Sequence, residues 1–279
     1  MAKWQLDRKV LQNRRLREAA KRCASCKKQT PIDLYTKMKN WNTKKGNIII
    51  QVLSGRSNAY LILIDNVAIL VDTGKASSLK TLSKNINSLN ITIKDISFII
   101  LTHTHFDHCQ STKKIKGISD CKIIVSRAAE DSIINGYTKL PDGTFLTTKL
   151  IAKFGRLMGK RKFGYEPFRP DIFVNEDYEL KIGDSEIKVI KTSGHSVDSV
   201  SILLDNEIAI VGDAMFGVFK NSIFPPYSDD IIGLLESWDK LLNTDCRIFL
   251  PGHGKEISRY LLQNEHKKYA KKHIKPYSQ

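Results

Sequence analysis

Short apolar runs recur along the chain from residue 47 and are separated by turn-forming polar residues. Runs of this kind, rich in Val, Ile and Leu, are typical of strands buried on both faces. They predict strands at residues 47–53, 59–64, 67–71, 97–102, 122–126, 178–182, 186–192, 200–204, 208–211 and 247–250. Helical spacing predicts helices at residues 77–90, 228–242 and 256–272. Because the strands outnumber the helices and occur in hairpin-like runs in both halves, the pattern predicts an α/β sandwich of two packed sheets.

Residues 127–175 interrupt the strand pattern and contain a short amphipathic stretch. At helical spacing its apolar positions are Leu150, Ile151, Phe154, Leu157 and Met158, and its basic positions are Lys149, Lys153, Arg156 and Lys160. Three hypotheses fit: a lid over a substrate pocket, an ordinary helix packed on the core, or a helix that attaches to an anionic membrane. We assign the segment as a lid-like insertion.

The net charge of +16 is concentrated at the two ends of the sequence. Residues 1–45 hold fourteen Lys and Arg against three Asp and Glu, and residues 255–279 hold seven against two. The remaining residues, 46–254, carry equal numbers of basic and acidic side chains. The pattern predicts a basic N-terminal helical arm over 1–45 and a catalytic domain over 46–279. The arm is expected to pack on the body or on a second subunit, which would give a homodimer.

Other features of composition indicate a cytoplasmic protein. The first residues are charged and lack the apolar core of a secretory signal, and no stretch approaches the length of a membrane span. Five scattered cysteines argue against a disulfide framework. The pair Cys23 and Cys26 forms a single CxxC, for which free thiols are favoured over a metal or redox role.

The densest chemical signal is the cluster His103-Thr-His105-Phe-Asp107-His108, which follows an apolar run. Three imidazoles and a carboxylate within six residues would be costly to bury without a partner, whereas a divalent cation satisfies all of them. The cluster therefore predicts a metal site.

Three further candidate ligands follow strands elsewhere in the chain. His195 lies in Gly-His-Ser, Asp213 in Gly-Asp, and His253 in Pro-Gly-His-Gly. Glycine beside each of them permits tight corners and close approach of the backbone. With Val71-Asp-Thr-Gly and the histidine cluster, these ordered motifs make the chain resemble the metallo-β-lactamase fold superfamily over roughly residues 46–254. The resemblance implies a four-layer αββα sandwich with an HxHxDH metal site of the glyoxalase II and lactonase type.

Carried over to this sequence, the resemblance implies two divalent metal ions, with zinc preferred and iron or manganese as alternatives. His103, His105 and His195 would hold the first ion, and Asp107, His108 and His253 the second, with Asp213 and a hydroxide as bridges. Asp107 would also orient the nucleophile and transfer its proton. Asp72 is expected to support a ligand and not to be one.

The substrate is predicted less sharply than the metals. Phe216, Phe219 and Phe224 follow Asp213 and are expected to line an apolar pocket, which favours a small molecule with an ester, lactone or thioester carbonyl. N-acyl homoserine lactonases, which the Asp213 segment resembles, carry a tyrosine where this chain has Phe216, so Tyr227 is the candidate donor to an oxyanion. The alternative is a phosphodiesterase or nuclease of the same fold whose basic tails bind nucleic acid. The neutral body disfavours that alternative.

Overall fold

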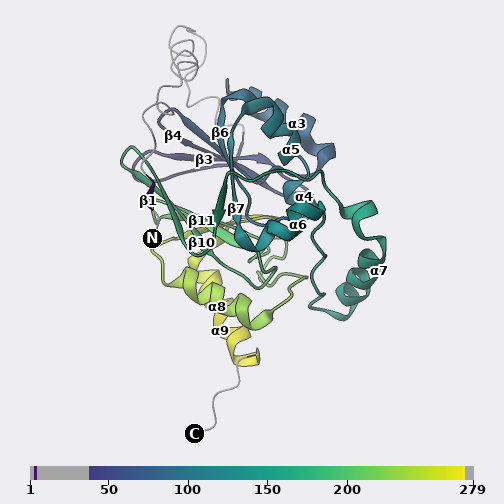
Figure 1. The fold of residues 1–279 in the computed structure, drawn as a ribbon. Coiled ribbons are helices and arrows are strands. Elements are labelled where there is room, and N and C mark those ends of the chain that lie inside the picture. The colour runs from purple at the N-terminus through teal and green to yellow at the C-terminus, as the bar shows by residue number, and fades with distance from the viewer. Residues whose placement is uncertain (1–2, 5–37, 274–279) are drawn as a thin grey trace.

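The computed structural model describes residues 3–4 and 38–273, and within them the chain forms two seven-stranded sheets with helices outside (Figure 1). The N-terminal sheet has its strands in sequence order: β2 (Asn40–Asn42), β3 (Ile48–Leu53), β4 (Ala59–Ile64), β5 (Val67–Val71), β6 (Ile96–Ile100), β7 (Lys122–Ser126) and β8 (Ile172–Val174). Strands β2 to β5 pair antiparallel, and β5 to β8 pair parallel. Each parallel pair needs a crossover, which here contains a helix.

Apart from the short edge strand β1, the C-terminal sheet is built from later parts of the chain. Its order is β1 (Lys3–Trp4), β9 (Tyr178–Ile182), β10 (Ser185–Lys191), β11 (Val200–Leu204), β12 (Ile208–Gly212), β13 (Ile248–Pro251) and β14 (Ile257–Ser258). Strands β9 to β12 form an antiparallel meander, and β12 pairs parallel with β13. Strand β14 pairs antiparallel with β13, and β1 pairs parallel with β9 at the other edge. Each sheet thus contains an antiparallel meander whose last strand pairs parallel with the next strand in the sequence.

The helices lie on the outer faces of the sheets. They are α3 (Leu79–Asn87), α4 (Phe106–Cys109), α5 (Thr112–Ser119), α6 (Glu130–Asn135), α7 (Leu146–Phe163), α8 (Ile231–Leu242) and α9 (Arg259–His273), with short 3₁₀ turns at Ala76–Ser78, Ile93–Asp95 and Arg127–Ala129. Figure 1 shows α3 and α5 on one side of the molecule and α8 and α9 on the opposite side, with the strands between them. Helix α7 projects at the edge. No helix of the described residues is long and apolar enough to cross a membrane.

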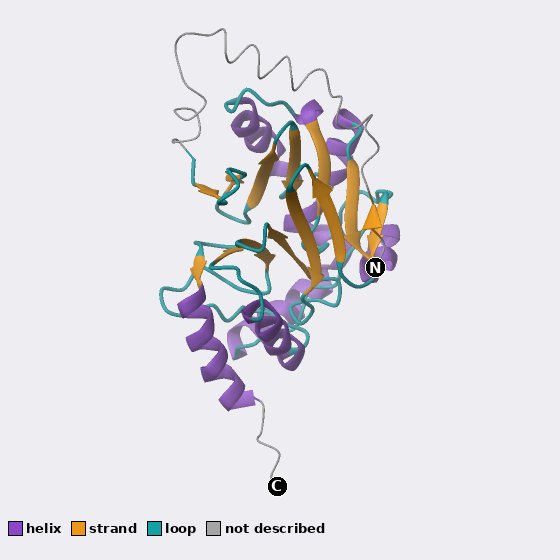
Figure 2. Cartoon of the chain, turned by 90° about the vertical axis from the view of Figure 1, so that its left-hand side faces the viewer, coloured by secondary structure: helices purple, strands orange, loops and turns teal. Residues whose placement is uncertain are grey.

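Three separate apolar clusters define the layers. On β4, Ile62 belongs to the cluster between the two sheets, and its neighbour Leu61 belongs to the cluster under α3 and α5. This alternation follows from the two-residue period of a strand, and it explains why the strands read as unbroken apolar runs. The third cluster lies between the C-terminal sheet and α8, around Trp238. Helix, sheet, sheet and helix form four layers (Figure 2), which confirms the predicted αββα sandwich.

Two sequence-based boundaries differ from the structure. Strand β8 closes the 127–175 insertion and extends the N-terminal sheet, because its apolar residues Ile172 and Val174 pack in the core between the sheets. Strands β1 and β2 fall within 1–45, the stretch predicted as a helical arm, yet they pair with β9 and β3. The rest of that stretch, 5–37 with Cys23 and Cys26, lies outside the described residues.

Candidate metal centre

The candidate ligands converge because parallel strands end at one edge of the sandwich. In the N-terminal sheet, Val71 at the end of β5 lies opposite Ile100 at the end of β6, which places Asp72 beside the loop that carries His103. In the C-terminal sheet, Gly212 at the end of β12 lies opposite Pro251 at the end of β13. The residues that follow these four strand ends therefore meet across the two sheets.

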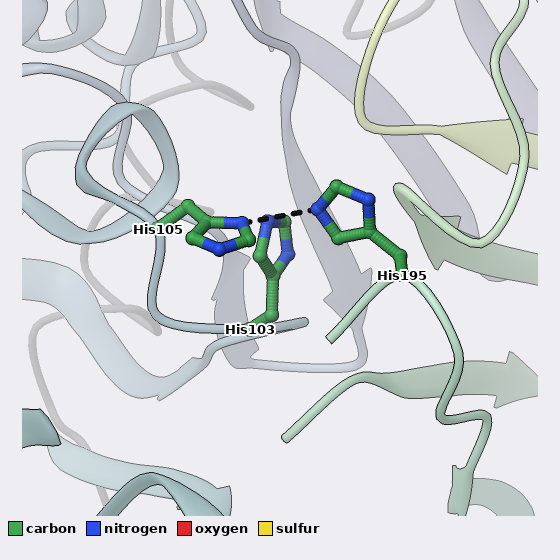
Figure 3. A group of neighbouring side chains, drawn as sticks. All are labelled: His103, His105 and His195. Carbon is green, nitrogen blue, oxygen red and sulfur yellow. Dashed lines mark hydrogen bonds between the residues drawn. The ribbon is translucent and has the colours of Figure 1, made fainter. Parts of the chain in front are cut away.

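All seven residues predicted as ligands lie in one cluster. Their ligand atoms form three overlapping groups in which every atom lies within 4.8 Å of the others: His103, His105 and His195; His103, His108 and Asp213; Asp107, His108 and His253. Figure 3 shows the rings of the first group converging from two loops that are far apart in sequence. Groups of this composition fit zinc and other borderline divalent cations.

Hydrogen bonds to the outer ring nitrogens set the direction of the two loop histidines. His105 Nε2 donates to the carbonyl of Lys139 at 3.2 Å, and His195 Nδ1 donates to the carbonyl of Tyr227 at 2.9 Å. The inner nitrogens, His105 Nδ1 and His195 Nε2, therefore both carry lone pairs, and they lie 3.0 Å apart (Figure 3). Two facing lone pairs repel each other unless a cation or a proton lies between them.

Asp72 orients the third histidine. Its carboxylate accepts from His108 Nδ1 at 2.8 Å and from the backbone N–H and hydroxyl of Thr102. That same hydroxyl accepts from His103 Nδ1 at 3.0 Å, so one buried carboxylate fixes the tautomers of two candidate ligands. Asp72 thus orients His108 directly and His103 through Thr102, as expected for a residue that supports ligands.

Asp213 lies in the middle of the cluster. Its carboxylate oxygens are 3.2 Å from His253 Nε2, 3.4 Å from His108 Nε2 and 3.7 Å from His195 Nε2. Among the described residues, Asp213 Oδ1 and His103 Nε2 are the buried side-chain polar atoms without a hydrogen-bond partner. Native proteins rarely bury unpaired acceptors, and both of these point into the cluster. The donor set therefore fits bound cations.

The protonation states of His103, His195 and Asp213 agree with this fit. Burial, and then the neighbouring His108, holds the pKa of His103 well below its usual range, and burial lowers the pKa of His195 to about 4. Burial acts to raise the pKa of Asp213, but the surrounding histidines hold it well below its usual range. Burial also acts to lower the pKa of His108, yet Asp213 and Asp72 outweigh it and raise the pKa to about 10. Neutral imidazoles and ionised carboxylates are the states that bind metal, so His103, His195 and Asp213 are ready to bind, whereas His108 must release a proton to do so.

Glycine is required where the backbone closes around the cluster. A Cβ on Gly252 would lie 2.1 Å from Asp213 Oδ1 and 2.7 Å from the His108 ring. Gly194, with φ of 131°, leaves a Cβ position only 2.4 Å from the backbone of Leu234 on α8. Gly252 thus leaves room for two candidate ligands, and Gly194 lets the His195 loop pack closely against α8.

Asp107 lies at the border between the cluster and solvent. Its side chain is 13% exposed, and its Oδ2 is 3.7 Å from His253 Nε2. It also lines a cavity of about 460 Å³ that opens above the cluster, with His105, His195, Asp213 and His253 at its base. Like Asp213, this carboxylate therefore faces both the candidate metal ligands and an incoming molecule.

The predicted pocket residues divide into two groups. Phe216 and Tyr227 line the cavity, and the Phe216 ring packs 4.8 Å from that of His253. Phe224 lies elsewhere, buried in the core against Trp238 and Tyr269. Phe219 is not a lining residue and is half exposed beside Phe216. The spacing of aromatic residues in an irregular loop does not fix which way each ring points.

Two candidate functional residues were not predicted from the sequence. Asp198 is a buried carboxylate that accepts from the Thr104 backbone at 2.8 Å and from the hydroxyls of Thr104 and Ser196, so it ties the loop of His105 to that of His195. The polar run Ser196–Ser199 between two strands was its only signal. Arg56 lines the cavity from the β3–β4 loop, and nothing in its sequence context marked it.

Comparisons with known proteins agree with this geometry. Residues 54–253 match the profile of the metallo-beta-lactamase superfamily. A probable metallo-hydrolase of Methanocaldococcus jannaschii is 30% identical over 203 residues, which cover 71% of this chain and 87% of that protein. A beta-lactamase-like protein 2 homologue of Caenorhabditis elegans is 27% identical over 204 residues, which cover 73% of this chain and 57% of that protein.

Solved structures show the same fold. A subclass B3 metallo-beta-lactamase of Bradyrhizobium japonicum superposes with a TM-score of 0.61 at 18% identity, covering 80% of this chain and 88% of that one. The chain belongs to the metallo-beta-lactamase superfamily. It is a metal-dependent hydrolase, as the sequence predicted.

Proposed function

We propose that the protein is a dinuclear hydrolase, with zinc the best fit and iron or manganese as alternatives, that cleaves an ester, lactone or thioester carbonyl bond in a small molecule. The observation that carries the proposal is the position of Asp213. Its Oδ2 lies 3.7 Å from His195 Nε2 and 3.2 Å from His253 Nε2, and its Oδ1, which is 3.4 Å from His108 Nε2, is buried without a hydrogen-bond partner. A carboxylate shared between two ligand groups is suited to bridging two cations.

In this proposal His103, His105 and His195 hold one cation, and Asp107, His108 and His253 hold the other. When bound, such a pair supplies a water of lowered pKa as nucleophile and a positive charge that polarises the scissile bond.

The chain's own residues supply the remaining functions. Asp107 faces both the cluster and the cavity, so its carboxylate can orient the nucleophile and hold the transferred proton. Tyr227 lines the same cavity and is the candidate donor to a developing oxyanion.

The cavity favours a small substrate with an apolar part. Its apolar walls come from Leu140, Ile151, Phe163 and Val218. Among the lining residues outside the candidate ligand set, Arg56 carries the positive charge. Apolar walls with a few polar anchors are typical of sites for small molecules. Arg56 is placed to hold an anionic group of the substrate, away from the reacting bond.

A phosphodiester substrate is the second candidate, since the fold and the ligand set serve it equally well. The chain's basic tails favour it, but the cavity has a single cationic lining residue outside the cluster. Nucleic-acid sites usually follow the phosphate backbone with several Lys and Arg side chains. We therefore rank the carbonyl substrate first.

We also infer that the protein works in a reducing compartment, the cytoplasm. Cys109, Cys121 and Cys246 are buried free thiols in the described part of the chain. Free buried cysteines are ordinary in reducing compartments. The proposed homodimer contact through the arm concerns residues that the structure mostly leaves undescribed.

A metal analysis combined with a substrate panel tests the proposed function. The purified full chain is expected to contain two equivalents of divalent metal and to hydrolyse esters, thioesters or acyl homoserine lactones faster than a cephalosporin or bis(p-nitrophenyl) phosphate. Asp213→Asn should lose both metal and turnover, whereas Asp131→Asn, the same change on exposed α6, should keep both. Preference for the phosphodiester would establish the second candidate, and protein without divalent metal would overturn the proposal.

A further inference from the structure

Helix α7 exposes its apolar side chains instead of burying them. Leu146, Leu150, Phe154 and Leu157 are 83%, 61%, 66% and 78% exposed, and Ile151 and Met158 are also exposed. The first four recur at i, i+4, i+8 and i+11, so they form one stripe along the helix. The hypothesis that this stripe packs on the core is therefore wrong. Contiguous apolar surface of this kind marks a binding site.

The inward face of α7 is made of small residues. Ala152 and Gly155 are its buried positions, and both line the cavity. A Cβ on Gly155 would lie 2.6 Å from Leu140 Cδ1, so the glycine lets the helix lie close to the cavity wall. None of the four stripe residues lines the cavity, whereas the exposed Ile151 beside them does. The stripe therefore lies next to the cavity and not inside it.

Basic side chains flank the stripe. Residues 144–165 contain six Lys and Arg and no Asp or Glu. Lys149, Lys153, Lys160, Arg161 and Lys162 are exposed, and Arg156 pairs with Asp142 just before the helix. An apolar stripe beside a one-sided basic face is the arrangement of helices that lie in the interface of an anionic membrane.

The same charge argues against two other occupants. A second copy would bring its own basic α7 against this one, and the N-terminal stretch 1–45 carries a net charge of +11. Like charges oppose both contacts at ordinary ionic strength. An anionic lipid surface complements the face in both charge and hydrophobicity.

The mouth of the cavity lies beside this face. Ile151 of α7 and Val218 of the loop after β12 are both exposed and both line the cavity. The segment before α7 is fixed to the opposite rim by hydrogen bonds from Thr144 to the carbonyls of Pro225 and Pro226. A surface bound at α7 would therefore lie next to the entrance of the cavity.

We propose that α7 docks this enzyme on an anionic phospholipid bilayer, with Leu146, Leu150, Phe154 and Leu157 inserted among the acyl chains and the flanking lysines at the headgroups. The helix lies in the plane of the interface. Docking places the cavity mouth at the lipid surface, where amphiphilic substrates concentrate. The docking proposal rests on the exposed apolar and basic side chains of α7 and does not depend on which bond the enzyme cleaves.

Vesicle binding by the full chain tests the proposal. Sedimentation with vesicles of phosphatidylcholine containing 30% phosphatidylglycerol should recover wild-type protein, and pure phosphatidylcholine should recover far less. Leu150→Glu/Phe154→Glu should weaken partitioning about tenfold or more. Ile134→Glu/Tyr260→Glu is the matched control, because it changes two exposed apolar residues outside α7 and alters net charge equally. This control should bind like wild type, which separates α7 from the basic tails.

Insertion is tested independently of the glutamate variants. A tryptophan introduced by Leu157→Trp should shift its emission to the blue on anionic vesicles and become shielded from acrylamide. Equal binding by the two double variants, or an unshielded tryptophan, would overturn the proposal in favour of the basic tails. A wild-type dimer that Leu150→Glu/Phe154→Glu converts to a monomer would also overturn it, in favour of a second copy. Turnover of a short soluble ester in vesicle-free buffer reports on the proposed function separately.

Discussion

Asp72 has a left-handed backbone, with φ of 61°, and a fully buried carboxylate. Both features cost free energy, and they are retained where the surrounding contacts fix them. Here the contacts are the bonds to His108 and Thr102. We therefore expect the aspartate to position candidate ligands, and its loss should lower metal affinity before it lowers the stability of the fold.

Asp72→Asn keeps the shape of the side chain and tolerates the left-handed backbone, but it removes the charge that orients His108. We expect metal affinity to fall about 10- to 100-fold, because partners of ligand histidines typically contribute this much. Competition with a chromophoric chelator measures the change. The control is Asp120→Asn, the same substitution at an exposed left-handed aspartate, φ 53°, at the end of α5. Unchanged metal affinity in Asp72→Asn would contradict the proposed positioning.

Gly252 shows how little free space the centre has. Gly252→Ala would press its methyl group against Asp213 and His108, which both belong to the candidate ligand set. A displacement of about 1 Å at a reacting centre can cost about 100-fold in rate. We expect a loss of that size in kcat/KM on the best substrate of the panel, together with reduced metal content. The control is Gly117→Ala on α5, where a Cβ meets nothing within 4 Å, and it should keep the wild-type kcat/KM and metal content. Wild-type values in Gly252→Ala as well would contradict the ligand assignment.

Helices α7 and α8 differ in how many apolar residues hold them to the body. Helix α8 buries Leu234, Leu235, Trp238 and Leu241 and has Asp230 as an N-cap that accepts from two backbone N–H groups. Helix α7 buries only Ala152 and Gly155 and is kinked at Gly159. Local opening is easiest where few apolar contacts are lost. Helix α7 is therefore expected to open locally more easily than α8 and to adapt to a bound surface.

Hydrogen exchange measures this difference. We expect backbone amides of α7 to exchange at least about 100-fold faster than those of α8, since each factor of ten corresponds to about 1.4 kcal/mol in opening free energy. Addition of the phosphatidylglycerol vesicles should slow exchange in α7 and leave α8 unchanged. Equal protection of the two helices in vesicle-free buffer would contradict the weak attachment of α7.

The elements also show what the sequence could predict. The bounds of strands such as β4 and β5 can be predicted from the sequence, because burial on both faces makes these strands continuous apolar runs. The direction of the α7 stripe could not be predicted, since an amphipathic pattern gives the apolar face but not what that face contacts. Short edge strands such as β2 have too few residues for a recognisable pattern.

At the candidate metal centre, too, residues in local sequence patterns could be predicted, and long-range contacts could not. His103 to His108 are neighbours in sequence, and the strand-end motifs carry the other candidate ligands. By contrast, Asp198 and the carbonyls of Lys139 and Tyr227 act through long-range contacts that no local pattern encodes.

At the scale of the whole molecule, the two sheets are joined by Asp205 at the edge opposite the metal centre. This residue lies in the β11–β12 turn of the C-terminal sheet, and its carboxylate accepts from Asn47 at 2.6 Å and Thr43 at 3.0 Å, both beside strands of the N-terminal sheet. It also accepts from the backbone N–H of Glu186. Burial acts to raise the pKa of Asp205, but these hydrogen bonds and Lys45 outweigh it and hold the pKa below its usual value.

The sign of this shift predicts a pH-dependent contribution to stability. A carboxyl whose pKa is lower in the folded state stabilises the fold fully above its unfolded value, here near 3.8, and loses that contribution as the pH falls through the folded value. Asp205→Asn should lower the free energy of unfolding at pH 7 by about 1–3 kcal/mol, because buried donors lose their charged acceptor. Urea titrations should show the deficit unchanged from pH 7 to 5 and shrinking below about pH 4. The control, Asp184→Asn at an exposed neighbouring position, should show no loss of unfolding free energy. If the loss in Asp205→Asn stayed the same at low pH, packing and not charge would join the sheets there.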